Sequence, residues 1–152
     1  MSRLLLAGML VSSAAAQTSV EPLPSEQIRL NQVGFYPDGP KRAAVVDAAE
    51  GPFSVVSAET GEIAFTGTLG AERNWQWSGE NVCLADFSSL TNEGFYYLDV
   101  PGVGTSYPFV IAPNAHEEVT RGSLKALYYQ RVSTALESEH AGAWARLLGH
   151  PD

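Results

Sequence analysis

Short apolar runs separated by turn signals fill the middle of the chain, and this pattern constrains the fold more than any other feature. Seven such runs lie between Ile28 and Ile111, with the spacing of about 8–12 residues that is typical of a sandwich. No segment with helical spacing separates them, which argues against a parallel α/β sheet, because parallel strands need helical connections. The pattern therefore predicts an all-β sandwich. The expected strands are 28–33, 42–47, 53–57, 63–68, 81–87, 94–100 and 106–111.

The expected strands supply enough apolar residues for one continuous core. Turn residues bound them, as at Pro37–Pro40 and at Gly102 and Gly104. We therefore assign residues 28–112 to one sandwich domain. The candidate core residues are Val45, Val55, Phe65, Leu84, Tyr96, Leu98, Val100 and Phe109.

The periodicity changes after Pro113 to one that favours helix. Asn114 followed by Glu117 matches an N-cap with its capping-box partner. We expect a helix over 116–136 and a second short helix over 141–148, in a helical segment that spans 113–152. A helix that is apolar on more than one side packs against two neighbours, and the sandwich supplies only one. The candidate packing residues of this helix are Leu124, Leu127, Tyr128, Tyr129 and Val132.

The first residues of the chain indicate export. A short positively charged start precedes the apolar run Leu4–Val11, and Ala14 and Ala16 then form an A-x-A cleavage pattern. This predicts a secretory signal peptide over 1–16 and a periplasmic or extracellular protein. The apolar run is shorter than the roughly 20 residues of a membrane span, so we expect no membrane anchor after cleavage. Residues 17–27 are polar, contain two prolines and are interpreted as a linker.

Charge and cysteine content exclude several partners. The formal net charge is -8, and loss of the signal peptide, which carries one arginine and no acid, makes it -9. An acidic chain without a Lys/Arg cluster has no field that attracts nucleic acid or anionic membranes. The single cysteine, Cys83, cannot form an internal disulfide and lies in an apolar run. We interpret it as a small buried hydrophobic residue.

No motif in the sequence qualifies as a catalytic or metal centre. Glycoside hydrolysis needs two carboxyl groups that flank the scissile bond. Most acidic residues here fall in turns, and Asp86 and Asp99 lie at strand positions that we expect to face outward. There is no G-x-S-x-G elbow, and we expect no cofactor. Metal-ligand spacing is missing among His116, His140, His150 and Cys83.

Trp75 and Trp77 are the clearest candidates for a ligand surface. Alternate residues of an extended segment point to one face, so both indoles would lie side by side. Aromatic faces stack on sugar rings, which suggests a carbohydrate platform. The alternative, which the residue type favours, is that both rings cover a sheet edge or pack on a neighbouring domain.

Four segments of the chain occur together in an informative order and spacing. They are 28–35 (IRLNQVGF) with 40–43 (PKRA), 78–82 (SGENV) leading to 85–88 (ADFS), 94–96 (GFY) leading to 106–111 (SYPFVI), and 124–131 (LKALYYQR). Together they resemble the N-terminal immunoglobulin-like domain of family 9 glycoside hydrolases, the cellulases and endoglucanases, and its exit into the catalytic domain. The resemblance covers the chain from about Ile28 to Asp152.

The resemblance implies a sandwich that leads directly into an (α/α) barrel, which cleaves β-1,4-glucan with inversion. The barrel's Asp pair and distant Glu would lie beyond Asp152, so no catalytic residue is carried over. We therefore expect a supporting module that is inactive by itself, with the absent barrel as its partner in cis. An autonomous carbohydrate-binding module that uses Trp75 and Trp77 remains the alternative.

The end of the chain also departs from the family pattern. Gly142–Arg146 and Gly149–Asp152 resemble the approach to the first catalytic motif. Relatives often carry, in place of Gly149, the cysteine of a Cys-His pair that binds zinc. The glycine therefore removes the expectation of zinc at His150.

Overall fold

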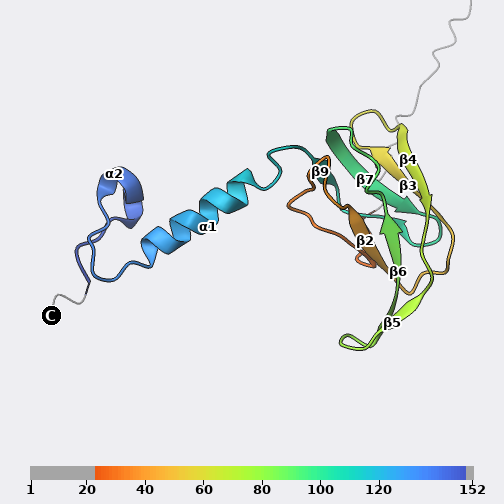
Figure 1. The fold of residues 1–152 in the computed structure, drawn as a ribbon, viewed down its shortest axis with the longest axis horizontal. Coiled ribbons are helices and arrows are strands. Elements are labelled where there is room, and N and C mark those ends of the chain that lie inside the picture. Colours follow the sequence, from red (N-terminus) through yellow and green to blue (C-terminus); the bar gives the residue numbers. More distant parts are fainter. Residues whose placement is uncertain (1–22, 150–152) are drawn as a thin grey trace, which may run out of the picture.

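The computed structural model describes residues 23–149 and contains a β-sandwich followed by a short helical segment (Figure 1). The expected signal peptide, most of the expected linker and His150 lie outside the described residues. Within residues 23–149, no helix has the length and apolar character needed to span a bilayer.

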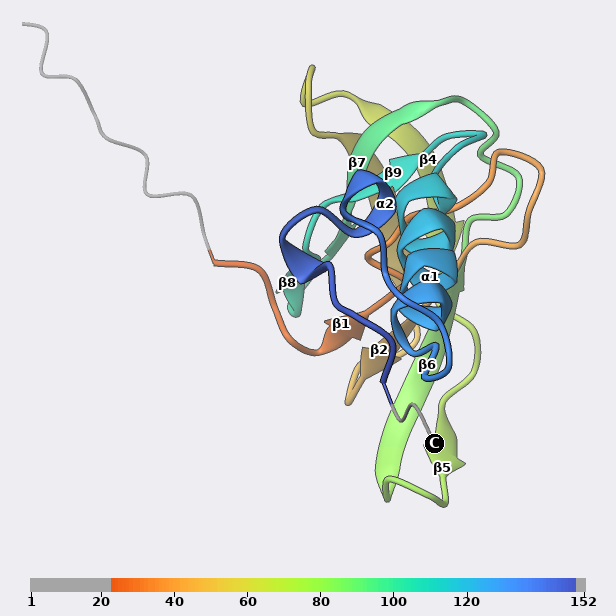
Figure 2. The same cartoon turned by 90° about the vertical axis from the view of Figure 1, so that its left-hand side faces the viewer.

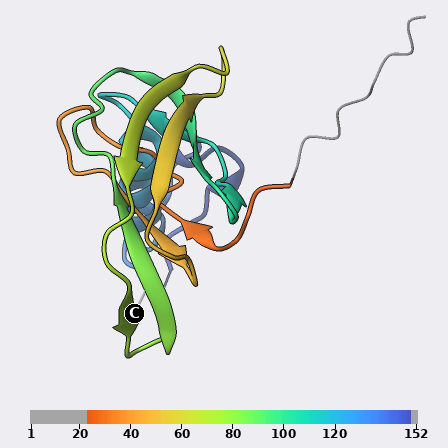
Figure 3. The same ribbon diagram turned by 90° about the vertical axis from the view of Figure 1, so that its right-hand side faces the viewer.

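The sandwich consists of two antiparallel sheets, which Figure 3 shows from the side opposite the helices. One sheet has the strand order β1-β2-β6-β5. The other has the order β4-β3-β7-β8, and β9 also pairs with β7. This architecture confirms the predicted all-β sandwich. The first sheet contains β1 (Ile28–Arg29), β2 (Arg42–Val46), β6 (Glu80–Asp86) and β5 (Arg73–Trp75). The second contains β4 (Ile63–Thr68), β3 (Pro52–Ser57), β7 (Gly94–Val100), β8 (Gly104–Thr105) and β9 (Phe109–Ile111).

The core lies between the sheets and is centred on aromatic rings. The ring of Phe35 meets those of Phe87 and Phe109 edge-on, at centroid distances of 5.5 and 5.4 Å. Such edge-to-face pairs add to the stabilisation that burial alone provides. The predicted core residues that are buried are Val45, Val55, Tyr96, Leu98, Val100 and Phe109.

Two predicted core residues differ from expectation. Phe65 is partly buried and packs against the edge of the core. The prediction for Leu84 was wrong, because its side chain is 48% exposed. Side chains alternate between the two faces of a strand, and Cys83 and Ala85 occupy the inward positions of β6. Leu84 must then face outward.

The first expected strand, 28–33, is shorter than predicted, since β1 ends at Arg29. The side chain of Asn31 supplies the reason. Its Oδ1 accepts a hydrogen bond from Val33 N at 3.1 Å, and its Nδ2 donates to Gly34 O at 2.9 Å. Asparagine side chains that bond to the following backbone in this way form turns and compete with strand pairing.

The main helix, α1 (Glu117–Tyr129), is also shorter than the predicted 116–136. The guanidinium of Arg146 donates to Tyr129 O at 3.3 Å and to Arg131 O, so it satisfies carbonyls at and beyond the helix end. The expected capping box is absent. The N-cap is His116, without a side-chain cap bond, and Asn114 contributes its backbone carbonyl to Glu117 N instead.

The predicted second helix is replaced by two short elements. These are α2 (Ser138–Ala141) and a 3-10 turn, η1 (Gly142–Trp144). Backbone hydrogen bonds between Leu136 and Arg146 close this segment on itself. In Figure 1, α1 extends away from the sandwich with α2 at its far end, and Figure 2 shows both helices in front of the sheets.

Candidate functional site

The two candidate tryptophans lie on the β5–β6 hairpin, which projects beyond the rest of the sandwich (Figure 1). Trp75 ends β5, whereas Trp77 lies in the turn that follows, where Ser78 N and Gly79 N both bond to Trp75 O. The two residues therefore do not belong to one extended segment. This differs from the sequence analysis, which placed both indoles on one face of such a segment. Both indoles face solvent, with exposed fractions of 57% for Trp75 and 81% for Trp77.

An ion pair lies beside Trp75. Glu80, in β6, is the cross-strand partner of Trp75. The Glu80 carboxylate accepts two hydrogen bonds of 2.8 Å from the guanidinium of Arg29. These bonds, together with one from Ser78, lower the pKa of the Glu80 carboxyl, and they raise the pKa of Arg29. Glu80 is therefore a charged, paired carboxylate and is unsuited to the role of a general acid at neutral pH.

Asp86 and Cys83 have structural partners as well. Asp86 faces outward as predicted, and the pKa of its carboxyl is lowered by hydrogen bonds from Ser88 and then from Arg42. The thiol of Cys83 is buried and lies 3.2 Å from Ala48 O, and burial raises its pKa. This confirms Cys83 as a buried residue, and a protonated thiol inside a core is a poor nucleophile.

The histidines do not assemble a metal site in the described part of the chain. His116 bonds to the backbone of the β1–β2 loop, and His140 lies on α2 beside the ring of Tyr128. Residues 23–149 contain no cluster of three or more His, Cys, Asp or Glu side chains that would hold a metal ion.

The helical segment carries apolar side chains that nothing in the described chain covers. Leu124 and Leu127 on α1 are each 64% exposed, and Val132, just beyond the helix, is also exposed. Tyr128 and Tyr129 are half-buried, because their rings pack against each other and against the chain that folds back from Arg131 to Arg146. Trp144, Leu147 and Leu148 extend the same exposed apolar character.

The hydroxyl of Tyr129 is an unpaired polar atom in the helical segment. It is buried and has no hydrogen-bond partner among the described residues. Tyr129 also lines a hollow of about 210 Å³, together with Leu136, Trp144 and Arg146. A buried hydroxyl normally finds a partner, so the packing around Tyr129 leaves one polar group unsatisfied among the described residues.

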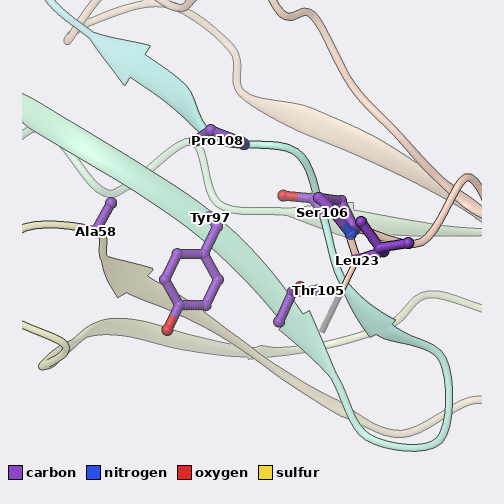
Figure 4. A pocket seen from close by; sticks show the side chains of 7 residues that line it. Leu23, Ala58, Tyr97, Thr105, Ser106 and Pro108 are labelled. Atoms are coloured by element: carbon purple, nitrogen blue, oxygen red, sulfur yellow. The ribbon is translucent and has the colours of Figure 1, made fainter. Parts of the chain in front are cut away.

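A second hollow lies on the sandwich and is mostly apolar. Its volume is about 420 Å³, and Figure 4 shows the ring of Tyr97 at its wall. Ser106 also lines it, but its hydroxyl is already engaged, since it accepts from Leu98 N and donates to Tyr107 O. The hollow is lined by Leu23, Pro24, Ala58, Tyr97, Thr105, Ser106 and Pro108, a set without a carboxylate or a histidine.

Comparison with known families agrees with the sandwich architecture. A family model described as the cellulase N-terminal Ig-like domain matches residues 24–105, which is more than half of the chain. The chain belongs to this family. The match includes β1 to β8 and ends before β9 and α1.

Individual relatives of this Ig-like domain extend the similarity past the sandwich. The chain is 36% identical over 148 residues to a xyloglucan-specific endo-β-1,4-glucanase, BoGH9A, from Bacteroides ovatus, and the match covers 97% of this chain and 25% of that enzyme. It is 39% identical over 116 residues to endoglucanase D from Acetivibrio thermocellus, covering 76% of this chain and 18% of the relative. The chain thus spans a quarter or less of the length of these relatives.

Solved structures give the same result. A Bacteroides ovatus family 9 glycoside hydrolase superposes with a TM-score of 0.72 at 36% identity, covering 86% of this chain and 23% of that one. A thermostable endoglucanase from Alicyclobacillus acidocaldarius superposes with a TM-score of 0.68 at 30% identity, covering 82% and 22%. The chain therefore resembles the N-terminal part of family 9 endoglucanases in both sequence and fold.

Several residues that shape the Ig-like domain and its exit escaped the sequence analysis. Lys41 entered the sequence analysis only as part of the motif 40–43, yet its side chain is completely buried. The contact between His116 and Gly34 joins positions that lie 82 residues apart in the chain. A glycine within the quoted motif was the only local signal of such a close approach.

Proposed function

We propose that this Ig-like domain is the supporting module of a secreted family 9 cellulase, whose catalytic barrel hydrolyses β-1,4-glucan. The module would stabilise the barrel through an interdomain interface and would have no hydrolytic activity of its own. The relatives support this role, because the two reported above are endoglucanases and the chain corresponds to a quarter or less of their length.

The observation that carries the proposal is the uncovered apolar surface after the sandwich. Leu124 and Leu127 are 64% exposed on the same helix. Contiguous apolar surface of this kind marks an interaction site in soluble proteins. A barrel that follows in cis would bury these side chains and would pack beside Tyr129, whose buried hydroxyl lacks a partner among the described residues.

A chimaera tests the supporting role. Residues 23–149 would replace the matching segment of the Bacteroides ovatus relative, and thermal stability and β-glucan hydrolysis would be measured. We expect the chimaera to be active and more stable than the relative's catalytic part alone. Substitution of both Leu124 and Leu127 by Ser should reduce that stability, whereas Ser at the exposed sandwich residue Leu84 should not.

Two results would contradict the supporting role. One is a catalytic part that is equally stable and active without any Ig-like domain. The other is turnover of carboxymethyl-cellulose by the 152-residue chain alone, which would make the chain itself an enzyme.

We propose as a second function that the β5–β6 hairpin contacts the glucan chain through Trp75 and Trp77. The exposure of both indoles on a projecting hairpin favours this interpretation. Polar groups that hydrogen-bond to sugar hydroxyls lie close by, such as the side chains of Asn74 and Asn81, which are bonded to each other at 3.0 Å. Exposed aromatic faces next to polar groups are typical of sugar-binding surfaces.

Binding to insoluble cellulose separates this contact from a purely structural hairpin. We expect the double variant Trp75→Ala, Trp77→Ala to lose retention on cellulose. Trp144→Ala is the matched control, since it removes an exposed tryptophan from the helical segment. A parent chain that is not retained, or a double variant that is retained equally, rules the contact out.

A further inference from the structure

The loop between β1 and β2 lies against the segment that leaves the sandwich, and we propose that the two form a joint that sets the direction of α1. Phe35 N donates to Val110 O at 2.9 Å, and Ala112 N donates to Phe35 O at 3.0 Å. These bonds make a parallel bridge between Phe35 and Ile111. The backbone of the exit segment is thereby fixed as far as Ala112, shortly before the helix begins.

Gly34 permits the close approach of the two segments. A Cβ atom at this position would lie 2.5 Å from Val110 Cγ1, 2.9 Å from Val110 O and 3.1 Å from Ala115 Cβ. Its φ of +118° is also a conformation that side chains disfavour. The loop therefore needs glycine here for two independent reasons, and the exit segment fills the space that a side chain would occupy.

His116, the N-cap residue of α1, completes the joint. Its Nε2 donates to Gly34 O at 2.9 Å, a contact that requires the proton to sit on Nε2. The imidazole also packs edge-on against the ring of Tyr36, with centroids 4.6 Å apart. Asn31 Nδ2 donates to the same Gly34 carbonyl at 2.9 Å, so one oxygen ties the loop to the start of the helix.

Apart from this joint, few contacts among the described residues hold α1 against the sandwich. Among the described residues, the hydrogen bond from His116 Nε2 to Gly34 O connects this helix and its N-cap with the sandwich, and the rest of α1 extends away from the sheets (Figure 1). His116 and Tyr36 are therefore positioning residues. On the proposed supporting role, they would set the orientation of whatever follows the helix relative to the sandwich.

Electron–electron distance measurements on the chain alone test the joint. Spin labels would be placed at Thr66→Cys on β4 and Ala126→Cys on α1, which are both exposed, while the native Cys83 is buried and stays unlabelled. We expect a single narrow distance distribution in the parent. His116→Ala and Tyr36→Ala should each lose that narrow distribution, while the melting temperature of the sandwich stays unchanged.

His140→Ala is the matched control, because it removes a histidine ring beside Tyr128 at the far end of α1, and it should keep the parent distribution. A distribution that is already broad in the parent, or that stays narrow in both joint variants, overturns the proposal. Because this measurement uses the 152-residue chain alone, failure here leaves the supporting role untouched, and failure of the chimaera leaves the joint untouched.

Discussion

The ammonium nitrogen of Lys41 lies 2.6 Å from the carbonyl oxygen of Pro37, although the lysine side chain has no exposed surface. The same nitrogen donates to Gly39 O at 2.8 Å and to Tyr36 O at 3.2 Å. Burial lowers the pKa of this lysine. The three carbonyl oxygens compensate for the lost hydration of the ammonium group, because each accepts a hydrogen bond from it. Lys41 thus fastens the Gly/Pro turn to the start of β2.

Replacement of Lys41 by Met should destabilise the sandwich. The chain length of the side chain is retained, but three carbonyl groups lose their donor, which we expect to cost about 2–3 kcal/mol of unfolding free energy. Urea denaturation followed by tryptophan fluorescence measures the change. Lys125→Met, at an exposed position on α1, is the control and should stay within about 0.5 kcal/mol. Equal losses in both variants would contradict a fastening role for Lys41.

Two glycine-to-alanine substitutions should have opposite effects. At Gly67 a Cβ would lie 2.6 Å from the ring of Phe53, so Gly67→Ala should lower the unfolding free energy by about 1–3 kcal/mol. At Gly122, inside α1, a Cβ meets nothing within 4 Å. Gly122→Ala should therefore raise the helical signal at 222 nm, with a gain of roughly 0.5–1 kcal/mol in helix stability. An unchanged unfolding free energy in Gly67→Ala would contradict this prediction, because it would show that the ring of Phe53 moves aside without cost.

The thiol of Cys83 should not react in the folded protein. It is completely buried, and burial raises its pKa, so little thiolate is available. We expect no labelling by a thiol reagent under native conditions and one labelled thiol per chain in urea. Leu84→Cys is the matched control, because the neighbouring position faces water and should label at once. Rapid labelling of Cys83 under native conditions would show that its side of β6 faces water and not the core.

Stability should fall in acid through Asp86. Hydrogen bonds from Ser88, followed by Arg42, lower the pKa of this carboxyl in the folded state. The folded state then binds the proton less tightly than the unfolded state, so the stabilisation is present above a pH of about 4 and is lost as the pH falls through the folded pKa.

Urea midpoints measured between neutral pH and about pH 2 test this dependence. Asp86→Asn should reduce the loss of unfolding free energy in acid. The reduction should be less than about 1 kcal/mol, because the pair is solvent-exposed. Glu59→Gln, in an exposed turn, should leave that loss unchanged. A loss of the same size in Asp86→Asn would exclude the carboxyl as its source.

Local pattern was sufficient for most of the sandwich. Alternating apolar residues and turn signals predicted β4 and β7 with the bounds that the structure has, because these strands begin and end at glycine-rich or polar turns. The short strands β5 and β8 were missed, since they have two or three residues and no apolar alternation. These short strands form because a longer neighbouring strand provides backbone hydrogen bonds along its edge.

The candidate sites were less accessible to sequence reasoning. Trp75 and Trp77 were singled out as aromatic candidates, but their geometry depended on a turn that the pattern did not reveal. The end of α1 was misplaced for a similar reason, since the carbonyls near it bond to Arg146, which lies well beyond the helix.

The sequence by itself determined the class of the fold and the family, because apolar alternation, turn residues and motif spacing are properties of neighbouring residues. Only the tertiary structure decided that Leu84 faces water, that Lys41 is buried, and that His116 meets Gly34 across 82 positions of the chain. Each of these depends on strand register or on close approach between distant segments. Such contacts arise from packing the whole chain, which no local pattern encodes.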